Sequence, residues 1–349
     1  MTLKNNLFAL FLLLYIHSPA QKKYIVQTIA FYNLENLFDT INNPNKMDEL
    51  SPIMEIKSRR KEIYTDKLSK LASVLSSIGK QQNNLPPSII GVAEVENKKV
   101  LEDLIATDPL NKYHYQIIHF DAPDLRGIDT ALLYNRDVFT PIRSEAIDAK
   151  LYNNNFIVHT RDILWVTGYL LNEKVNILVN HWPSRRGGAK KSSILRERVA
   201  KRNLYILSKI HEEDPNAKII IMGDFNDNPT NKSFKQILQT KKAKTELEKG
   251  DLYNPFEKMF IAGLNTLTYR SELFLFDQIL FSDNFITLKK DFSSFRFYKA
   301  GIFNPNYMTL QKGKYKGSPK RSFSGSTYLG GYSDHYPVYG YLVKENKSN

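Results

Sequence analysis

One short polar stretch, directly after an apolar run, contains residues that could do chemistry. The run Ile219 to Met222 is apolar, and polar and turn residues come at once after it: Gly223, Asp224, Asn226 and Asp227. A short apolar run closed by turn residues is typical of a buried strand, whose end lies at the sheet rim where α/β proteins bind ligands. The stretch therefore predicts either an ordinary chain reversal or a polar site that binds a metal ion or a phosphate.

Five further apolar runs end in polar residues of the same kinds. These residues are Asn33 with Glu35, Glu94, Asn180 with His181, Asp277, and Asp334 with His335. Each residue alone has an ordinary structural explanation, such as a helix cap, a core histidine or a turn. Six strand ends with similar chemistry favour one shared polar site over six unrelated roles.

The elements that must position these residues are strands and helices mixed along the whole chain. Strand-like runs recur from Tyr24–Leu34 to Tyr336–Val343. Apolar residues at helical spacing predict a helix in Arg59–Gly79 and an amphipathic helix in Ser192–His211. This mixture argues for one α/β domain, covering residues 22–345, with sheets inside and helices outside.

Residues 1–20 predict a secretory signal peptide. Lys4 gives a positive start, Leu7–Ile16 is apolar, and Ser18–Ala20 is a small-residue cleavage site. The apolar run is too short to span a membrane, and there is no cysteine for a disulfide or a lipid anchor. We expect an exported protein, periplasmic or extracellular, with no stable membrane anchor. Nothing in the sequence implies a protein partner, and we expect a monomer.

The motifs, in their order, resemble the endonuclease/exonuclease/phosphatase superfamily of metal-dependent phosphodiesterases, deoxyribonuclease-like enzymes among them. The resemblance is carried by FYNLENLFD, GDFN and a late SDH, and it runs from Phe31 to Val338. FYNLENLFD and HWPSRRGG are similar to a branch of exported bacterial proteins. The resemblance implies a four-layer α/β sandwich, in which two packed mixed β-sheets are flanked by helices and the site lies at one rim.

The resemblance also implies which residues hold the metal. Glu94 resembles the principal ligand of the family, and Asn33 lies beside it. Glu35 would contribute to the metal shell if its strand continues, because it would then share a face with Asn33. Asp334 lies next to the metal in relatives.

Further residues resemble the catalytic set of the family. Asp224 and Asn226 would orient the attacking water and the phosphate. His335 resembles the catalytic histidine, and Asp277 the carboxylate that fixes its tautomer and stabilises its charged form. His181 lies where deoxyribonucleases and sphingomyelinases have a second histidine.

The expected cofactor is Mg²⁺, with Mn²⁺ as a substitute. A phosphodiester repels a nucleophile by its negative charge, so cleavage needs a hard divalent cation, oriented donors and an activated water. Mg²⁺ prefers oxygen ligands and keeps several waters, so one or two carboxylates suffice. The absence of cysteine and the small number of histidines argue against a zinc cluster.

Two interpretations fit the segment DLRGIDTALLYN. Arg126 can hold a phosphate while Asp129 orients His181. Alternatively, the two residues form an incidental ion pair in a β-turn.

Positive charge bears on the substrate. The formal charge of +13 becomes +12 without Lys4, which suits an anionic partner. Arg185 and Arg186 begin a basic loop after HWPS that suits a polyphosphate backbone. A second basic stretch, Lys312–Arg321, contains an aromatic residue, which also suits nucleic acid.

We therefore predict a nuclease that hydrolyses DNA or RNA by metal-assisted in-line attack of water. The alternatives on the same fold are a sphingomyelinase-like phospholipid phosphodiesterase and an inositol-phosphate phosphatase. The sequence shows no exposed aromatic and aliphatic hairpin of the kind that membrane-active relatives use for docking.

Overall fold

The long apolar runs form strands that are buried on both faces. In β1 (Tyr24–Leu37), Ile29 and Phe31 lie in the apolar core between two sheets, while Ala30 and Tyr32 lie in the core under the helices. Successive side chains of a strand point to opposite faces, so a strand covered on both sides reads as a continuous apolar run. The centre of the molecule is therefore built from such runs.

The computed structural model describes residues 23–153 and 156–346, and within them two six-stranded mixed sheets pack face to face. The predicted signal peptide lies outside the described residues. The first sheet has, in spatial order, β15 (Arg296–Ile302), β18 (Val338–Glu345), β1, β2 (Ile89–Val95), β4 (Asp129–Asn135) and β3 (Tyr115–His119). The second has β11 (Leu252–Tyr253), β14 (Asp277–Ser282), β10 (Ile219–Asp224), β9 (Glu173–His181), β8 (Ile163–Leu170) and β5 (Phe139–Ile147).

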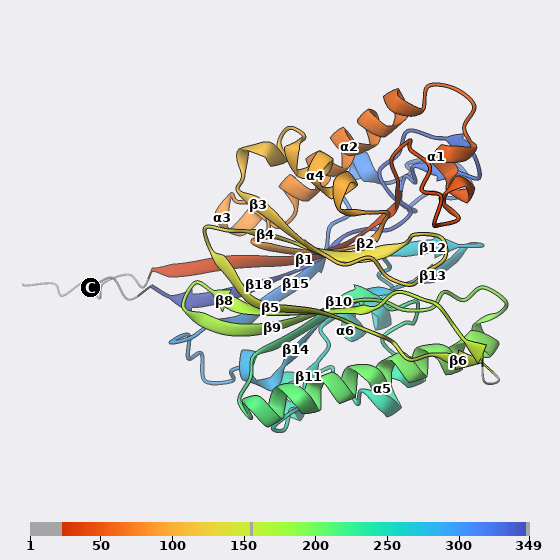
Figure 1. Cartoon of the computed structure of the whole chain (residues 1–349). Helices are drawn as coiled ribbons and strands as arrows, with labels where there is room; N and C mark the ends of the chain where they lie inside the picture. The colour runs from red at the N-terminus through yellow and green to blue at the C-terminus, as the bar shows by residue number, and fades with distance from the viewer. Residues whose placement is uncertain (1–22, 154–155, 347–349) are drawn as a thin grey trace, which may run out of the picture.

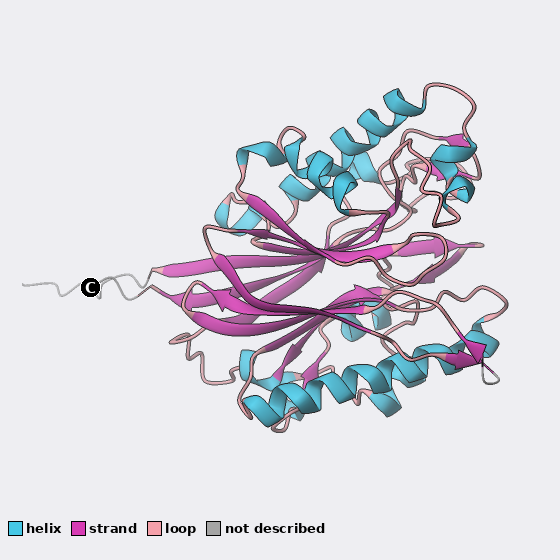
Figure 2. Ribbon diagram, in the orientation of Figure 1, coloured by secondary structure: helices cyan, strands magenta, loops and turns pink. Residues whose placement is uncertain are grey.

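Helices cover the outer faces of both sheets, which gives four layers (Figures 1 and 2). On the first sheet lie α1 (Pro52–Glu55), α2 (Arg60–Ser77), α3 (Lys80–Asn83) and α4 (Lys98–Ala106). The second sheet is covered by α5 (Ala189–Glu213), and α6 (Phe256–Ile261) follows β11. The four-layer α/β sandwich that the sequence predicts is confirmed.

The remaining elements are short. Three hairpins are formed by β6 (Tyr152–Asn153) with β7 (Phe156–Ile157), β12 (Leu267–Tyr269) with β13 (Glu272–Phe274), and β16 (Phe323–Ser324) with β17 (Thr327–Tyr328). Single helical turns occupy Asp48–Leu50, Leu110–Lys112, Ser233–Ile237, Lys244–Glu246, Asp283–Phe285 and Asn306–Met308.

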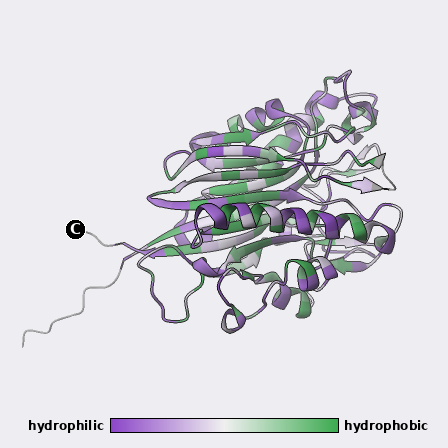
Figure 3. Cartoon of the chain, turned by 60° about the horizontal axis from the view of Figure 1, so that its bottom comes forward, coloured by the Kyte–Doolittle hydropathy of each residue, from purple (hydrophilic) through white to green (hydrophobic). Residues whose placement is uncertain are grey.

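Both predicted helices form. The helix predicted from Arg59 to Gly79 is α2, which ends shortly before Gly79, a residue in the left-handed region at φ +72°. The predicted amphipathic helix is α5, which mixes hydrophilic and hydrophobic residues along its length (Figure 3) and buries Val199 and Ile206 against the second sheet. Among the described residues, no helix combines the length and the apolar character that crossing a membrane requires.

The strand directions bring the predicted polar residues to one edge. β1 runs parallel to β2, β9 runs parallel to β10, and the two pairs face each other across the core. The register places Asn33 beside Ala93, and it places Asp224 between His181 and Asp277. The ends of these parallel strands therefore meet at the rim where the sequence predicts a site.

Candidate active site

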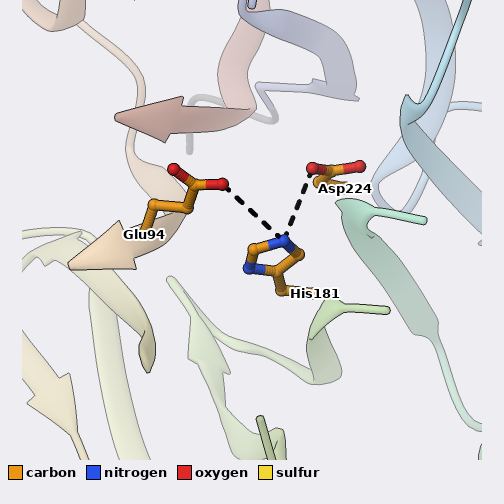
Figure 4. Close-up of side chains that lie close together, drawn as sticks. All are labelled: Glu94, His181 and Asp224. Carbon is orange, nitrogen blue, oxygen red and sulfur yellow. Dashed lines mark ion pairs between the residues drawn. The ribbon is translucent and has the colours of Figure 1, made fainter. Parts of the chain in front are cut away.

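At this rim, Glu94, His181 and Asp224 point toward one another (Figure 4). Nε2 of His181 lies 3.9 Å from Oε1 of Glu94 and 3.6 Å from Oδ2 of Asp224. Asn33 joins the two carboxylates, since its Nδ2 donates to Oε1 of Glu94 at 3.2 Å and to Oδ2 of Asp224 at 3.1 Å. Four strands, two from each sheet, thus contribute to one polar cluster.

Irregular backbone at the strand ends helps to aim these side chains. Glu94 has a φ of +59°, and the register of β2 against β4 shifts just there. Asn226 has a φ of +49°, its backbone N–H donates to Asp224 at 3.0 Å, and its side-chain amide donates to the carbonyl of Trp182 at 3.1 Å. Non-glycine residues held in this region cost energy, and they gather at functional sites.

A buried histidine and aspartate lie beside this cluster. Nδ1 of His335 is 2.7 Å from Oδ2 of Asp277, and its Nε2 is 3.9 Å from Oδ2 of Asp224. Burial disfavours the charged ring, but the carboxylates of Asp277 and Asp224 outweigh that effect and raise the pKa of His335 well above its usual range. The arrangement is a charged imidazole held by one carboxylate and aimed toward another.

Asp224 and His181 respond to their shared surroundings in different ways. Burial raises the pKa of Asp224 to about 7, a change that the charge of His335 opposes and the charge of Asp277 reinforces. Burial and the positive charges of Arg161 and Arg126 lower the pKa of His181 well below its usual range. Asp224 can therefore exchange a proton near neutral pH, while His181 stays neutral.

We expect the two site histidines to differ in charge in the metal-free protein at pH 7. His335 should be protonated because of its two carboxylate neighbours, and His181 neutral because it is buried beside two arginines. Ring ¹⁵N chemical shifts measured by NMR from pH 5 to pH 8 would check this. The variant Asp277→Asn should lower the pKa of His335. A wild-type His335 ring that is neutral at pH 7 would contradict the expectation.

The cluster fits a divalent cation. Ligand atoms of Glu94, His181 and Asp224 all lie within 4.8 Å of one another. Burial raises the pKa of Asp224, the negative charge of Glu94 adds to that effect, and a cation would stabilise both carboxylates. Glu94 and Asp224 are the residues that would hold the ion, and hard oxygen ligands of this kind suit Mg²⁺.

Three predicted metal residues have other partners. Oδ1 of Asn33 accepts the backbone N–H of Glu35 at 2.9 Å, so Asn33 directs its amide nitrogen, which cannot bind a metal, toward the carboxylates. Oδ2 of Asp334 accepts a hydrogen bond from Arg321 at 3.0 Å. Glu35 lies outside the cluster, and its carboxylate accepts the backbone N–H groups of residues 322 and 323.

The condition on which Glu35 was expected to share a face with Asn33 is not met, because β1 is not regular there. Glu35 and Asn36 have φ values of +49° and +51°, and the pairing with β2 shifts register between Asn33 and Leu37. The alternation of side chains holds only for extended residues. Two left-handed residues break it and turn Glu35 away.

Of the two interpretations of the segment DLRGIDTALLYN, the one in which Asp129 orients His181 does not hold in the structure. Oδ2 of Asp129 lies 2.9 Å from Nε2 of His119, and its Oδ1 accepts the backbone N–H of Ala122 at 2.9 Å. Arg126 pairs instead with Asp124, to which Nη2 donates at 2.9 Å. Asp129 thus holds the β3–β4 connection, whereas the charge of Arg126 acts on His181.

Arg161 is a buried residue of the site that the sequence analysis missed. Its Nη2 donates to the carbonyl of Trp182 at 2.7 Å, and its Nη1 donates to Oδ2 of Asp124 at 3.2 Å. The guanidinium therefore supports the strand end that carries His181. Arg161 stands in a polar connection without a motif, and its partners are distant in sequence, so no local signal marks it.

The basic loop after His181 is partly anchored. Nε of Arg185 donates to the carbonyl of Asn226 at 2.9 Å, and its guanidinium lies 4.5 Å from the ring centre of Phe276. Arg185 thus fixes the loop against the GDFND turn. Arg186, Lys190 and Lys191 are exposed, and these three can contact a polyanion.

Comparison with known proteins gives one family and several similar folds. A sequence model described as the endonuclease/exonuclease/phosphatase family matches residues 28–344. No curated protein matches the chain significantly. A Bacteroides thetaiotaomicron structure described as an endonuclease/exonuclease/phosphatase family protein is 18% identical, with a TM-score of 0.55, and the match covers 94% of this chain and 98% of that one.

Two further structures have names that state an activity or a ligand. A mannosyl-6-phosphatase of Bacteroides thetaiotaomicron is 18% identical, with a TM-score of 0.54 and coverage of 90% of this chain and 99% of that one. TDP2 of D. rerio, complexed with a single-strand DNA product, is 15% identical, with a TM-score of 0.52 and coverage of 91% and 98%. At these identities the likeness concerns the fold.

Proposed function

The chain belongs to the endonuclease/exonuclease/phosphatase family, and on that basis we propose that it is an exported, Mg²⁺-dependent phosphodiesterase that hydrolyses nucleic acid. The members of this superfamily are metal-dependent phosphoric ester hydrolases. One observation carries the proposal. The His335–Asp277 pair and the Glu94–His181–Asp224 cluster share the carboxylate of Asp224, so a proton-transfer group and a cation-binding group meet at one place.

In this proposal the chain's own residues do the following. Asp224 orients the attacking water through a hydrogen bond, next to the cation that it and Glu94 would hold. His335, kept charged by Asp277, donates a hydrogen bond to the phosphoryl group. Neutral His181 donates a second hydrogen bond. A bound Mg²⁺ would supply positive charge to the phosphoryl oxygens.

Positive charge at the rim supports nucleic acid as the substrate. Arg186 is exposed on the loop that follows the β9 end of the site, and Lys190 and Lys191 are exposed in the first turn of α5. A backbone of repeated phosphates can contact several of them at once. The similar fold of TDP2, solved with a DNA product, agrees with this choice. Because the mannosyl-6-phosphatase has a similar fold as well, a phosphate monoester is included among the substrates to be tested.

The proposal is tested by offering the purified protein several substrates with Mg²⁺. We expect cleavage of supercoiled plasmid or RNA to be much faster than hydrolysis of sphingomyelin vesicles, inositol phosphates or mannose 6-phosphate. Intact plasmid and RNA together with hydrolysis of another substrate would overturn the nuclease assignment.

Export is tested separately, by sequencing the N-terminus of the protein recovered from outside the cytoplasm. It should begin at Gln21.

A hairpin favours phospholipid as a second candidate substrate. Contrary to the sequence expectation, the β12–β13 hairpin exposes Tyr269 and Leu273, which are 60% and 51% accessible. At its base, Phe274 packs against Phe276, and Arg185 lies over both rings. Exposed apolar groups next to a basic loop can contact a lipid surface.

Salt dependence separates the candidates. Replacing Arg186, Lys190 and Lys191 with serine should reduce the slope of log affinity for duplex DNA against log salt by about 1 to 3, since each lost phosphate contact changes it by about 0.9. Binding titrations at several NaCl concentrations measure this slope. The variant should hydrolyse bis-p-nitrophenyl phosphate normally, because so small a diester cannot reach the loop.

The matched control for this experiment removes three exposed lysines at the opposite end of the sheets, Lys174, Lys289 and Lys290. This control loses the same total charge as the test variant. Because its three lysines lie away from the site, it should leave the slope nearly unchanged. Equal slopes for the two triple variants would mean that the basic loop does not bind the nucleic acid backbone.

A further inference from the structure

The buried carboxylate of Glu35 already accepts hydrogen bonds from three neighbouring residues of the chain. Its side chain is 3% exposed, and it accepts hydrogen bonds from the backbone N–H of Ser322 and, at 3.2 Å, from that of Phe323. Nε of Arg321 donates to the same carboxylate at 3.4 Å. A carboxylate with these protein donors is poorly placed to bind a metal as well, because it would have to give them up.

The segment 321–323 is fixed by a second group of contacts that leaves Arg321 free for another role. Nζ of Lys67, on α2, is buried and donates to Oγ of Ser322 at 2.8 Å. The same ammonium lies 5.4 Å from the ring centre of Phe323, and Oγ of Ser322 donates to the carbonyl of Tyr332 at 2.9 Å. The segment is thus anchored without the guanidinium of Arg321.

Arg321 lies beside the active site, as two of its contacts indicate. Nη2 donates to Oδ2 of Asp334, the residue directly before His335, at 3.0 Å. Its other anchor, Glu35, is two residues from Asn33 and hydrogen-bonds to it through the backbone. Ser333 links the same two segments of the chain, since its hydroxyl donates to the carbonyl of Asn33 at 2.7 Å.

The guanidinium is held but not buried. The side chain of Arg321 is 49% exposed, and among the described residues its Nη1 makes no hydrogen bond. Arginine presents a planar fork of donors that matches two phosphoryl oxygens, and a cation fixed in advance needs no rearrangement when charge develops on them.

We propose that Arg321 binds the phosphoryl group of the substrate, and that Glu35 positions this guanidinium rather than binding the metal. The inference rests on the proposed phosphodiesterase function. It assigns a phosphate-binding role to a residue at the end of the second basic stretch, and it separates Glu35 from Glu94 in function.

The test compares Arg321→Gln with Arg321→Lys and with a matched control, Arg143→Gln. Arg143 is also partly exposed, at 35%, between two carboxylates, Glu145 and Glu213, but it lies toward the opposite end of the second sheet. Hydrolysis of bis-p-nitrophenyl phosphate with Mg²⁺ gives kcat and KM, calorimetry gives the Kd of inorganic phosphate, and thermal unfolding gives Tm.

We expect Arg321→Gln to lower kcat/KM by about 10- to 100-fold, the range for a lost charged hydrogen bond. It should weaken phosphate binding at an unchanged Tm. Arg321→Lys should fall between that variant and wild type, because it keeps the charge but loses the fork, and Arg143→Gln should match wild type. Wild-type kcat/KM and phosphate affinity in Arg321→Gln would overturn the proposal.

Glu35→Gln tests the second half of the proposal. It should lower kcat/KM as Arg321→Gln does, with no further loss in the double variant, while the Mn²⁺ affinity measured by calorimetry stays at the wild-type value. A large loss of Mn²⁺ affinity would instead make Glu35 a metal ligand. If wild type hydrolyses no diester, the proposed function fails, and the phosphate Kd alone decides the role of Arg321.

Discussion

Replacing His335 with alanine should lower kcat by at least ~10²-fold, the lower range for a positioned acid–base group. The imidazole is buried, 2.7 Å from Asp277 on one side and 3.9 Å from Asp224 on the other. Its charge therefore faces the carboxylate that we expect to orient the attacking water. Initial rates on plasmid and on bis-p-nitrophenyl phosphate, at saturating substrate and Mg²⁺, measure the loss. The loss should be similar for both substrates because it concerns the reacting phosphate.

The pair should act as one unit. Asp277→Ala, and the double variant with His335→Ala, should be about as defective as His335→Ala, since coupled residues lose their effect together. The control is His114→Ala. His114 also lies 2.7 Å from an aspartate, Asp137, but both side chains are exposed and away from the rim, so its rate should be that of wild type. Losses that multiply in the double variant would show that His335 and Asp277 act independently.

The sequence predicted the shared rim because each of its signals was local. An apolar run followed at once by a polar residue marks a strand end, and the ends of parallel strands lie together in an α/β fold. Asn33, Glu94, His181 and Asp224 follow this rule, and the structure brings them together with His335 and with Asp277, the first residue of the antiparallel strand β14. A pattern read at several strand ends could therefore predict a three-dimensional site.

The same rules failed where the backbone departs from regular structure. Glu35 was placed by strand alternation, but two residues in the left-handed region turn it toward the segment 321–323. One of the two interpretations of DLRGIDTALLYN has Asp129 orient His181, yet Asp129 is hydrogen-bonded to His119, ten residues away along the hairpin. A positive φ at a non-glycine residue has no clear sequence signature, so a sequence argument cannot anticipate these directions.

The buried ion pairs that support the site could not be predicted from the sequence either. Arg161 and Asp124 are linked across 37 residues of chain. Arg196, one of the basic residues that follow HWPS in the sequence, is buried with its Nε 2.7 Å from Asp227. A basic residue next to other basic residues reads as surface charge, and only the fold shows that one of them has a buried partner.

Replacing Glu94 with glutamine should lower activity at millimolar Mg²⁺ by more than ~100-fold. Mutating a residue that only hydrogen-bonds to a metal ligand typically costs 10- to 100-fold, and losing a ligand itself should cost more. Glu94 supplies one of the two carboxylates that face each other beside His181. Removing that charge leaves Asp224 as the one carboxylate of this cluster. EDTA should abolish the activity of wild type, and Mg²⁺ or Mn²⁺ should restore it.

The fold of this variant should survive, which makes the loss interpretable. Both oxygens of Glu94 accept hydrogen bonds, from Asn33 and from the backbone N–H of Asn36. Glutamine can keep one of these and lose the other, at a cost of about 1 kcal/mol of unfolding free energy. Circular dichroism and Tm would check this.

Glu96→Gln is the matched control for the metal assignment. Glu96 is a buried carboxylate two residues further along, where it accepts the backbone N–H of Asp39, and burial raises its pKa to about 7. Since it lies outside the Glu94–His181–Asp224 cluster, its loss should leave the Mg²⁺ concentration needed for half-maximal activity unchanged. For Glu94→Gln that concentration should rise, and the Kd for Mn²⁺ should rise with it. Full activity of Glu94→Gln at ordinary Mg²⁺ would remove Glu94 from the metal site and leave Asp224 as its main carboxylate.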